Sequence, residues 1–201
     1  MTRPRKYGDQ GQAFPIYITV VGGLLFLALA YFAVGQATVN RGGAQTAADA
    51  AALAAAQDLR DQLADEWVEA VLDPDAWNDI FEGDVQLAED PCERAGQLAG
   101  QNDADVRGCV DNGSPLGYQV EVQTRKPMGE SIVPATAQKR STANAKAVIE
   151  PLCTFKPLAE DAEDDVLPRL TCRDNKNWDL NPDDLTDLPG PEDLFDVHLA
   201  D

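Results

Sequence analysis

The sequence predicts an α+β protein in which a single N-terminal transmembrane helix is extended by a long alanine-rich helix, which packs on a small antiparallel sheet stabilised by disulfides. Three observations support this prediction. The chain contains one long apolar run without charge, at residues 13–39. An alanine-rich stretch without proline or glycine follows at residues 44–72. Beyond it, three runs alternate apolar and polar side chains, and four cysteines lie in the same part of the chain.

Length and charge restrict the classes of protein that the chain can represent. With 201 residues, it can form one ordinary domain with an anchor, but not two large cores. The 35 acidic and 16 basic residues give a net charge of −19, which argues against a nucleic-acid partner, because phosphates require a basic surface. The same sign disfavours non-specific attraction of the chain to anionic lipid. We expect four segments: a cytoplasmic N-terminal segment (1–12), the transmembrane helix (13–39), its extended alanine-rich continuation (40–72) and an acidic extracytoplasmic domain containing β-strands (73–201).

The apolar run has the length and uniformity of a membrane span. No charged residue lies between Asp9 and Arg41. Because about 20 residues cross the hydrocarbon core, residues 13–39 can span it with some tilt. A cleaved secretory signal is the alternative, since basic residues precede the run and small residues follow it. The apolar core of such a signal usually has about 7–15 residues, so an uncleaved anchor is the preferred interpretation.

Basic residues before the apolar run predict its orientation. Arg3, Arg5 and Lys6 precede it, whereas Arg41 follows it as a single charge. By the positive-inside rule the N-terminus is cytoplasmic, and the chain is a single-pass protein of the cell membrane with an extracytoplasmic C-terminal domain. The cysteines then lie in an oxidising compartment.

The alanine-rich stretch is expected to be helical, because alanine, leucine, glutamine and glutamate are strong helix formers. Leu59, Leu63, Trp67 and Val71 recur every four residues and form one apolar stripe. This stripe predicts that the helix packs against the rest of the domain. Together with the membrane span, it can form one nearly continuous rod.

Residues 11–56, GQAFPIYITVVGGLLFLALAYFAVGQATVNRGGAQTAADAAALAAA, resemble the N-terminal region of pilus-assembly proteins of the TadE/TadG-like group. That group belongs to the tight-adherence (Tad, or Flp) pilus systems. The features that carry the resemblance are Gly11 before the anchor, the membrane helix, and above all the block QTAADAAALAAA at residues 45–56. A linker helix that only holds a domain off the membrane is the structural alternative for this block.

The sequence departs from the prepilins of these systems, in which a glycine is followed at the fifth position by glutamate. Here Gly8 is followed at that position by Ala13, and Gly11 by Ile16. The membrane glutamate that would pair with a neighbouring subunit's N-terminal amine is also absent from the apolar run. The resemblance therefore implies a minor pilin-like component or an assembly factor rather than a major pilin.

Three alternating runs predict half-buried strands, at residues 117–125, 142–150 and 195–199. Each places apolar side chains on one face and polar side chains on the other. A sheet with one apolar face needs a cover, and the stripe of the long helix is the expected one. A helix packed on a small antiparallel sheet is also how pilin-like proteins are built.

The four cysteines are expected to form two disulfides. If sequence neighbours pair, Cys92 joins Cys109 and Cys153 joins Cys172, with separations of 17 and 19 residues; two other connectivities are open. A zinc site is disfavoured, because no Cys-x-x-Cys spacing occurs and the chain has a single histidine, His198.

The C-terminal region is strongly acidic, with 14 acidic and 3 basic residues between positions 160 and 201. Clustered oxygen ligands could suit calcium, although their spacing lacks the glycine of a calcium loop. Solvated, solubilising acid is the preferred interpretation, and no metal or cofactor site is predicted. The residues considered for calcium are Asp174, Asn175, Asn177, Asp179, Asp183 and Asp184.

No catalytic residue is predicted. His198 is the only histidine available as a base, and Ser114 lies in a turn-like sequence, DNGSPLG, without the elbow of a nucleophilic serine. No phosphate-binding glycine loop is present in the sequence.

These observations and the resemblance together predict a non-catalytic, membrane-anchored component of a Tad/Flp-type pilus or secretion assembly. Its partners would be the membrane and other proteins of that system, reached through helix packing at Gly22, Gly23, Ala28 and Ala30. An independent cell-surface binding protein, tethered by one helix, is the alternative.

Overall fold

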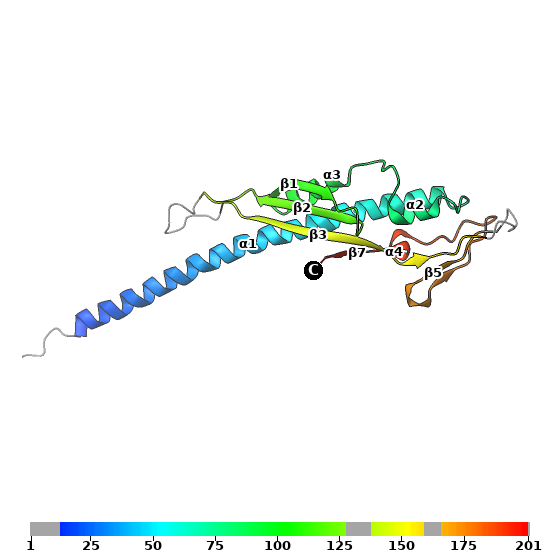
Figure 1. Cartoon of the computed structure of the whole chain (residues 1–201). Coiled ribbons are helices and arrows are strands. Elements are labelled where there is room, and N and C mark those ends of the chain that lie inside the picture. The colour runs from blue at the N-terminus through cyan, green and yellow to red at the C-terminus, as the bar shows by residue number, and fades with distance from the viewer. Residues whose placement is uncertain (1–12, 128–137, 159–165, 201) are drawn as a thin grey trace, which may run out of the picture.

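Helix α1 is the longest element of the computed structural model, which describes residues 13–127, 138–158 and 166–200 (Figure 1). It runs without a break from Ala13 to Glu69, 57 residues or about 85 Å at about 1.5 Å per residue. The helix ends before the predicted limit at residue 72, because the backbone continues into turns. In one of them, the N–H of Asp73 donates to the carbonyl of Ala70 at 2.9 Å.

The main sheet is antiparallel and has the strand order β1-β2-β3-β7. Its strands are β1 (Ala104–Asp111), β2 (Gly117–Thr124), β3 (Thr142–Pro151) and β7 (Phe195–Leu199). Strands β2, β3 and β7 confirm the three alternating runs. The edge strand β1 was not predicted, and its register against β2 shifts between Val106 and Gly108. The prediction of an α+β protein with an antiparallel sheet is confirmed.

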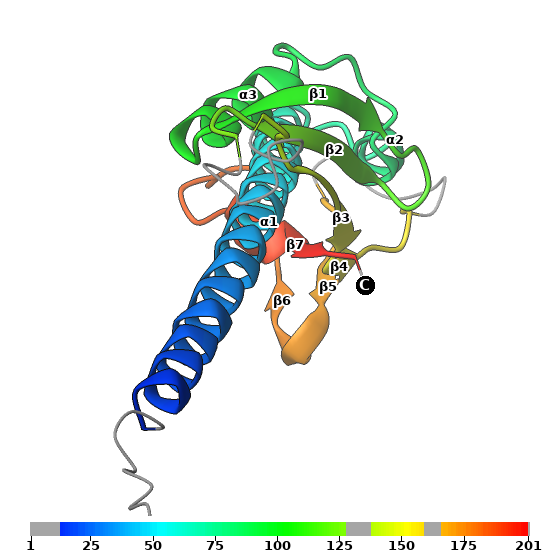
Figure 2. The same ribbon diagram turned by 90° about the vertical axis from the view of Figure 1, so that its left-hand side faces the viewer.

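The C-terminal half of α1 is enclosed between this sheet and helix α3 (Pro91–Gln101). Figure 2 shows the sheet curving over this half of α1, with α3 beside it. At about 100° per residue, the buried alanines of α1 cover about 200° of its circumference. Alanine has no side chain beyond Cβ, so the backbone of α1 can lie close to both neighbours. The buried alanines are Ala44, Ala47, Ala48, Ala51, Ala52, Ala54, Ala55 and Ala56.

The apolar stripe of α1 lies in the core, as predicted. Leu59, Leu63 and Trp67 are buried in α1, and Val71 is buried in the turn that follows the helix. At this end of the molecule, Trp67 packs against Trp77 of α2 (Trp77–Glu82), with ring centroids 5.3 Å apart. Phe155 lies edge-on to Trp77 at 5.1 Å. An aromatic cluster therefore closes the core at the end of α1 farthest from its N-terminus.

A local cap and a disulfide position helix α3. The carboxylate of Asp90 accepts a hydrogen bond from the N–H of Cys92 at 2.9 Å, and Pro91 occupies the first turn. Cys92 is bonded to Cys109 of the edge strand β1. The disulfide thus joins α3 to the sheet, and the two elements that enclose α1 are covalently linked.

A second, smaller antiparallel sheet lies beyond the aromatic cluster, with the order β4-β5-β6. Cys153 and Cys172 are opposite one another in this sheet and form the second disulfide. Both disulfides therefore join sequence neighbours. The remaining elements are β4 (Cys153–Thr154), β5 (Leu170–Cys172), the 3-10 helix η1 (Arg173–Asn175), β6 (Asn177–Trp178) and α4 (Pro191–Leu194).

Gly117, at the start of β2, is required where it lies. Its φ is 147°, and a Cβ atom added to it would come within 2.1 Å of the carbonyl oxygen of Ala147 on β3. Only a residue without a side chain permits this close approach of the two central strands.

Candidate functional site

The N-terminal half of α1 projects from the domain (Figure 1). It exposes apolar side chains around its circumference. The segment Phe14–Phe32 is long and apolar enough to cross a membrane, and in the described ranges it is the one helical segment that is. Tyr31, for example, is 83% exposed. An exposed apolar surface of this size marks a region that interacts with a partner or a membrane.

Two threonine hydroxyls in the N-terminal half of α1 are satisfied within the helix. The hydroxyl of Thr19 donates to the carbonyl of Pro15, and that of Thr38 to the carbonyl of Val34, both at 3.0 Å. Such bonding is what a helix in hydrocarbon requires, since no water is available to polar groups there.

The small residues predicted for helix packing lie on this exposed segment. A Cβ atom added to Gly22 or Gly23 would meet nothing within 4 Å, and Ala28 and Ala30 are exposed. At about 100° per residue, Gly22, Gly23 and Ala30 face directions within about 100° of one another, whereas Ala28 faces another side. Three of the four therefore lie on one side of α1, which they share with the exposed Phe26.

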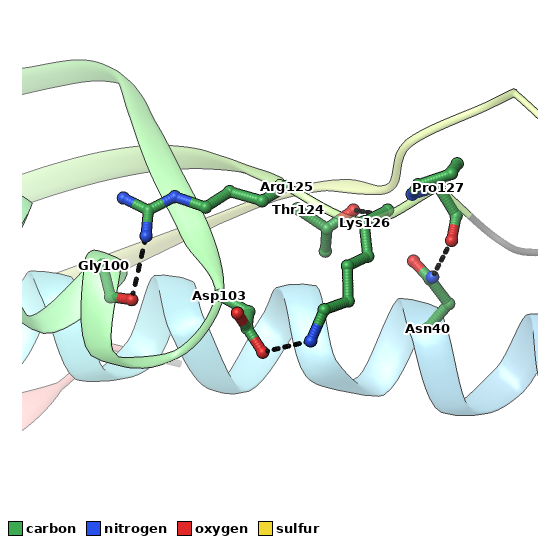
Figure 3. A network of polar contacts seen from close by, with 7 residues as sticks. All are labelled: Asn40, Gly100, Asp103, Thr124, Arg125, Lys126 and Pro127. Carbon is green, nitrogen blue, oxygen red and sulfur yellow. Dashed lines mark hydrogen bonds and ion pairs between the residues drawn. The ribbon is translucent and has the colours of Figure 1, made fainter.

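The transition from exposed to buried helix is abrupt, and the sheet is fastened to α1 there. The side chain of residue 39 is 76% exposed and that of residue 44 is fully buried. Between them, the amide of Asn40 donates to the carbonyl of Pro127 at 3.3 Å (Figure 3). The amide of Gln45 donates to the carbonyl of Asn144 on β3, also at 3.3 Å. These bonds hold the ends of β2 and β3 beside the middle of α1.

Charged side chains surround this junction. The ammonium of Lys126 pairs with Asp103 at 3.0 Å, and the guanidinium of Arg125 pairs with Asp105 at 2.7 Å. Arg125 also donates to the carbonyl of Gly100 at 3.3 Å, which connects the end of β2 to the end of α3 (Figure 3). Both ion pairs are exposed, so each contributes little to stability.

The residues considered for calcium are dispersed over η1, β6 and the loop that follows. Asp179 pairs with Arg169 at 2.8 Å. Asp184 accepts hydrogen bonds from the hydroxyl and the N–H of Thr186, and the hydroxyl bond is the larger cause that lowers the pKa of this carboxyl. Among the residues described here, no group of three or more His, Cys, Asp or Glu side chains is placed to hold a metal ion.

The two residues considered as catalytic base and nucleophile each have polar neighbours of their own. The ring of His198 lies 3.1 Å from the carboxylate of Asp196 on the same strand. Ser114 is exposed in the turn between β1 and β2, where its N–H donates to the carbonyl of Asn112 at 2.9 Å. In the described part of the chain, no hydrogen bond joins Ser114 to His198.

The residues at the junction were not predicted from the sequence. Asn40 and Pro127 lie 87 positions apart, and neither carries a local signal of contact. Lys126 and Arg125 stand at the end of a predicted strand, where polar residues are ordinary. Only the pairing of the sheet against α1 brings these side chains together.

The structure thus defines a class of molecule: an α+β domain built on the C-terminal half of a helix whose N-terminal half is apolar, exposed and long enough to cross a membrane. The family model described as Putative Flp pilus-assembly TadE/G-like matches residues 11–58, which are 48 of the 201 residues. The match covers the exposed segment, the junction and the alanine block, and it confirms the resemblance found in the sequence. No curated protein and no solved structure matches the chain.

Proposed function

We propose that the chain is a non-catalytic, single-pass membrane component of a Tad/Flp-type pilus or secretion assembly, acting as a minor pilin-like subunit or an assembly factor. The observation that carries this proposal is the division of α1 into two halves with different surroundings. One half exposes apolar side chains and no charge, and the other supplies buried alanines to the core of the domain. The family match includes most of both halves.

The arrangement supports a pilin-like role because one helix serves two purposes. In this proposal the N-terminal half lies in the membrane with the N-terminus in the cytoplasm, and the domain lies outside the cell. The charge distribution supports this orientation, since Arg3, Arg5 and Lys6 precede the apolar run. The two disulfides suit an extracytoplasmic domain.

Contact with other subunits is proposed to run through the exposed half of α1. Gly22, Gly23 and Ala30 carry little or no side chain, so a second helix can approach the backbone of α1 closely at these positions, beside the exposed ring of Phe26. Ala28 would serve a second contact on another side. Partners through this surface are membrane helices of the same assembly.

Membrane insertion is tested by placing charges on the exposed segment. In the double variant Leu24→Arg with Leu27→Arg, each arginine at the centre of a bilayer raises the free energy of membrane insertion by about 2.5–3.5 kcal/mol. We expect this double variant to be released from membranes by alkaline carbonate, whereas the wild-type chain stays. Val68→Arg with Leu72→Arg is the matched control, because these apolar residues are exposed in the domain. Release of the wild-type chain would refute the anchor.

Orientation and partners are tested in cells that carry a Tad/Flp system. Protease added outside spheroplasts should digest the domain and spare an N-terminal tag; the reverse pattern would refute the orientation.

A photo-crosslinking residue at Gly22 or Ala30 should join the chain to proteins of the pilus system. The same residue at Gln57, which is exposed on the domain half of α1, is the control. A free monomer at every position would favour an independent cell-surface binding protein instead.

A further inference from the structure

The basic residues are distributed unevenly over a strongly acidic chain. Although the net charge is −19, five of the 16 basic residues gather where the exposed half of α1 meets the domain. We call this surface the basic end and define it by its five exposed side chains: Arg41, Arg125, Lys126, Lys139 and Arg140.

Strand pairing and one hydrogen bond to α1 bring these residues together. Gln123 and Thr142 are partners in the ladder, and the N–H of Thr124 donates to the carbonyl of Ser141 at 2.9 Å. Residues 125–126, which follow β2, and residues 139–140, which precede β3, therefore lie at the same end of the sheet. The bond from Asn40 to Pro127 (Figure 3) places this end of the sheet beside α1 at the residue that precedes Arg41.

The basic end carries a positive excess after its ion pairs are counted. Lys126 and Arg125 are paired with Asp103 and Asp105. The other three basic side chains, at positions 41, 139 and 140, form no ion pair with any residue in the described ranges. Among the described residues, five positive charges and two negative partners leave an excess of three, on a surface that is open to solvent.

The height of the basic end along α1 coincides with the polar layer of a bilayer. From Phe14 to Val39, the exposed apolar stretch rises 25 residues, or about 38 Å at about 1.5 Å each. A hydrocarbon core is about 30 Å thick, and about 40–45 Å with its headgroups. Arg41 follows two residues later, so it lies at the level of the phosphates, with residues 139–140 at the neighbouring end of the sheet. This step rests on the proposed membrane insertion of α1.

We infer that the basic end binds the headgroups of anionic phospholipids in the membrane that α1 crosses. Each Lys or Arg near such a surface is attracted by it, and the attraction is screened within about 8 Å at physiological salt. The acidic remainder of the domain is repelled by the same lipids. The two effects act together: they hold this end of the sheet against the membrane and direct the rest of the domain away from it. The net charge of the chain, which argues against lipid attraction, thus hides a local surface of opposite sign.

The test compares the reactivity of two exposed amines in the full chain. The protein is reconstituted into nanodiscs of phosphatidylcholine alone, and into nanodiscs in which phosphatidylglycerol replaces part of it. A water-soluble acylating reagent then labels Lys139 at the basic end and Lys156, which follows β4, as the internal reference. With phosphatidylglycerol, we expect the Lys139 to Lys156 labelling ratio to fall about fivefold, the factor that corresponds to one basic side chain held at an anionic surface. The ratio should recover in about 1 M salt, where the Debye length is about 3 Å.

A pair of variants with equal charge change provides the control. Arg41→Gln with Arg140→Gln should reduce the protection of Lys139, whereas Arg94→Gln with Arg169→Gln should leave it unchanged. Equal labelling ratios in the two kinds of disc would overturn the inference while leaving the anchor intact. Protection in both kinds of disc that grows with the number of chains per disc would also overturn it, and would assign the surface to an acidic second copy. A chain that elutes apart from the discs would refute the anchor and the lipid contact together.

Discussion

Replacing Ala51 by leucine tests how tightly the sheet and α3 enclose α1. Ala51 is fully buried within the central cluster of the core. Because alanine and leucine differ little in helix propensity, the substitution acts through packing. Forcing extra carbon atoms into a close-packed core costs about 1–3 kcal/mol. For a domain of this size, that corresponds to a Tm about 2–12 °C lower.

The assay is thermal and denaturant unfolding of the full chain in detergent micelles, followed by circular dichroism and tryptophan fluorescence. Gln57→Leu is the control, since Gln57 is exposed on the same helix, and its free energy of unfolding should stay within about 0.5 kcal/mol of the wild type. If Ala51→Leu were as stable as the wild type, or more stable, there would be free space beside α1. The enclosure of the helix by two neighbours would then be wrong.

Three further predictions concern the domain. Leu63→Ala, at a fully buried position of the α1 stripe, should lower the free energy of unfolding by about 3–5 kcal/mol in denaturant titrations; a loss below about 1 kcal/mol would contradict its place in the core. Replacing Cys92 and Cys109 by alanine should cost about 3 kcal/mol, because it frees a 17-residue loop in the unfolded chain; equal denaturation midpoints with and without reductant would argue against it. Burial, and next the carboxylate of Asp111, raise the pKa of Tyr118 to about 12. The contribution of the protonated Tyr118 hydroxyl to the free energy of unfolding is therefore fully present below about pH 10, and it is lost as the pH rises from about 10 to about 12. The loss in the free energy of unfolding amounts to at most about 2–3 kcal/mol, and Tyr118→Phe should not show it; parallel pH profiles of the two proteins would contradict the shift.

The predictable elements are those whose side-chain periodicity survives in the structure. Strands β2 and β3 bury alternate residues, so residues 117–125 and 142–150 could be recognised by pattern alone. The stripe from Leu59 to Val71 repeats every four residues because one side of the helix faces the core. In each case a single buried face imposes the period that the sequence displays.

The missed elements lack that regularity for physical reasons. Strand β1 has a register shift between Val106 and Gly108, and Cys109 in this strand is bonded to Cys92, so its side chains give no regular alternation of apolar and polar residues. Helix α3 contains Gly96 and Gly100, which lower its helix propensity, although the cap Asp90 before a proline was an available signal. The strands of the second sheet have only two or three residues each, too few for a period.

The candidate site likewise has one part that the sequence predicts and one part that it does not. The exposed apolar segment could be predicted, because charge and hydropathy are local properties of the sequence. The basic end could not, since Asn40, next to Arg41, and Pro127, next to Lys126, come into contact only in the folded chain. Two positions separated by more than 80 residues give no pattern within a window of ordinary length.

The uninterrupted course of α1 has a mechanical consequence. No proline or loop divides the helix between Pro15 and Glu69, and its far half is fixed inside the domain. The helix therefore acts as a stiff lever, and any rotation of its apolar half turns the sheet through the same angle. A change of about 10° in inclination would displace the aromatic end by about 15 Å over its length of about 85 Å. Small movements among packed membrane helices would be delivered, amplified, to the surface farthest from the lipid.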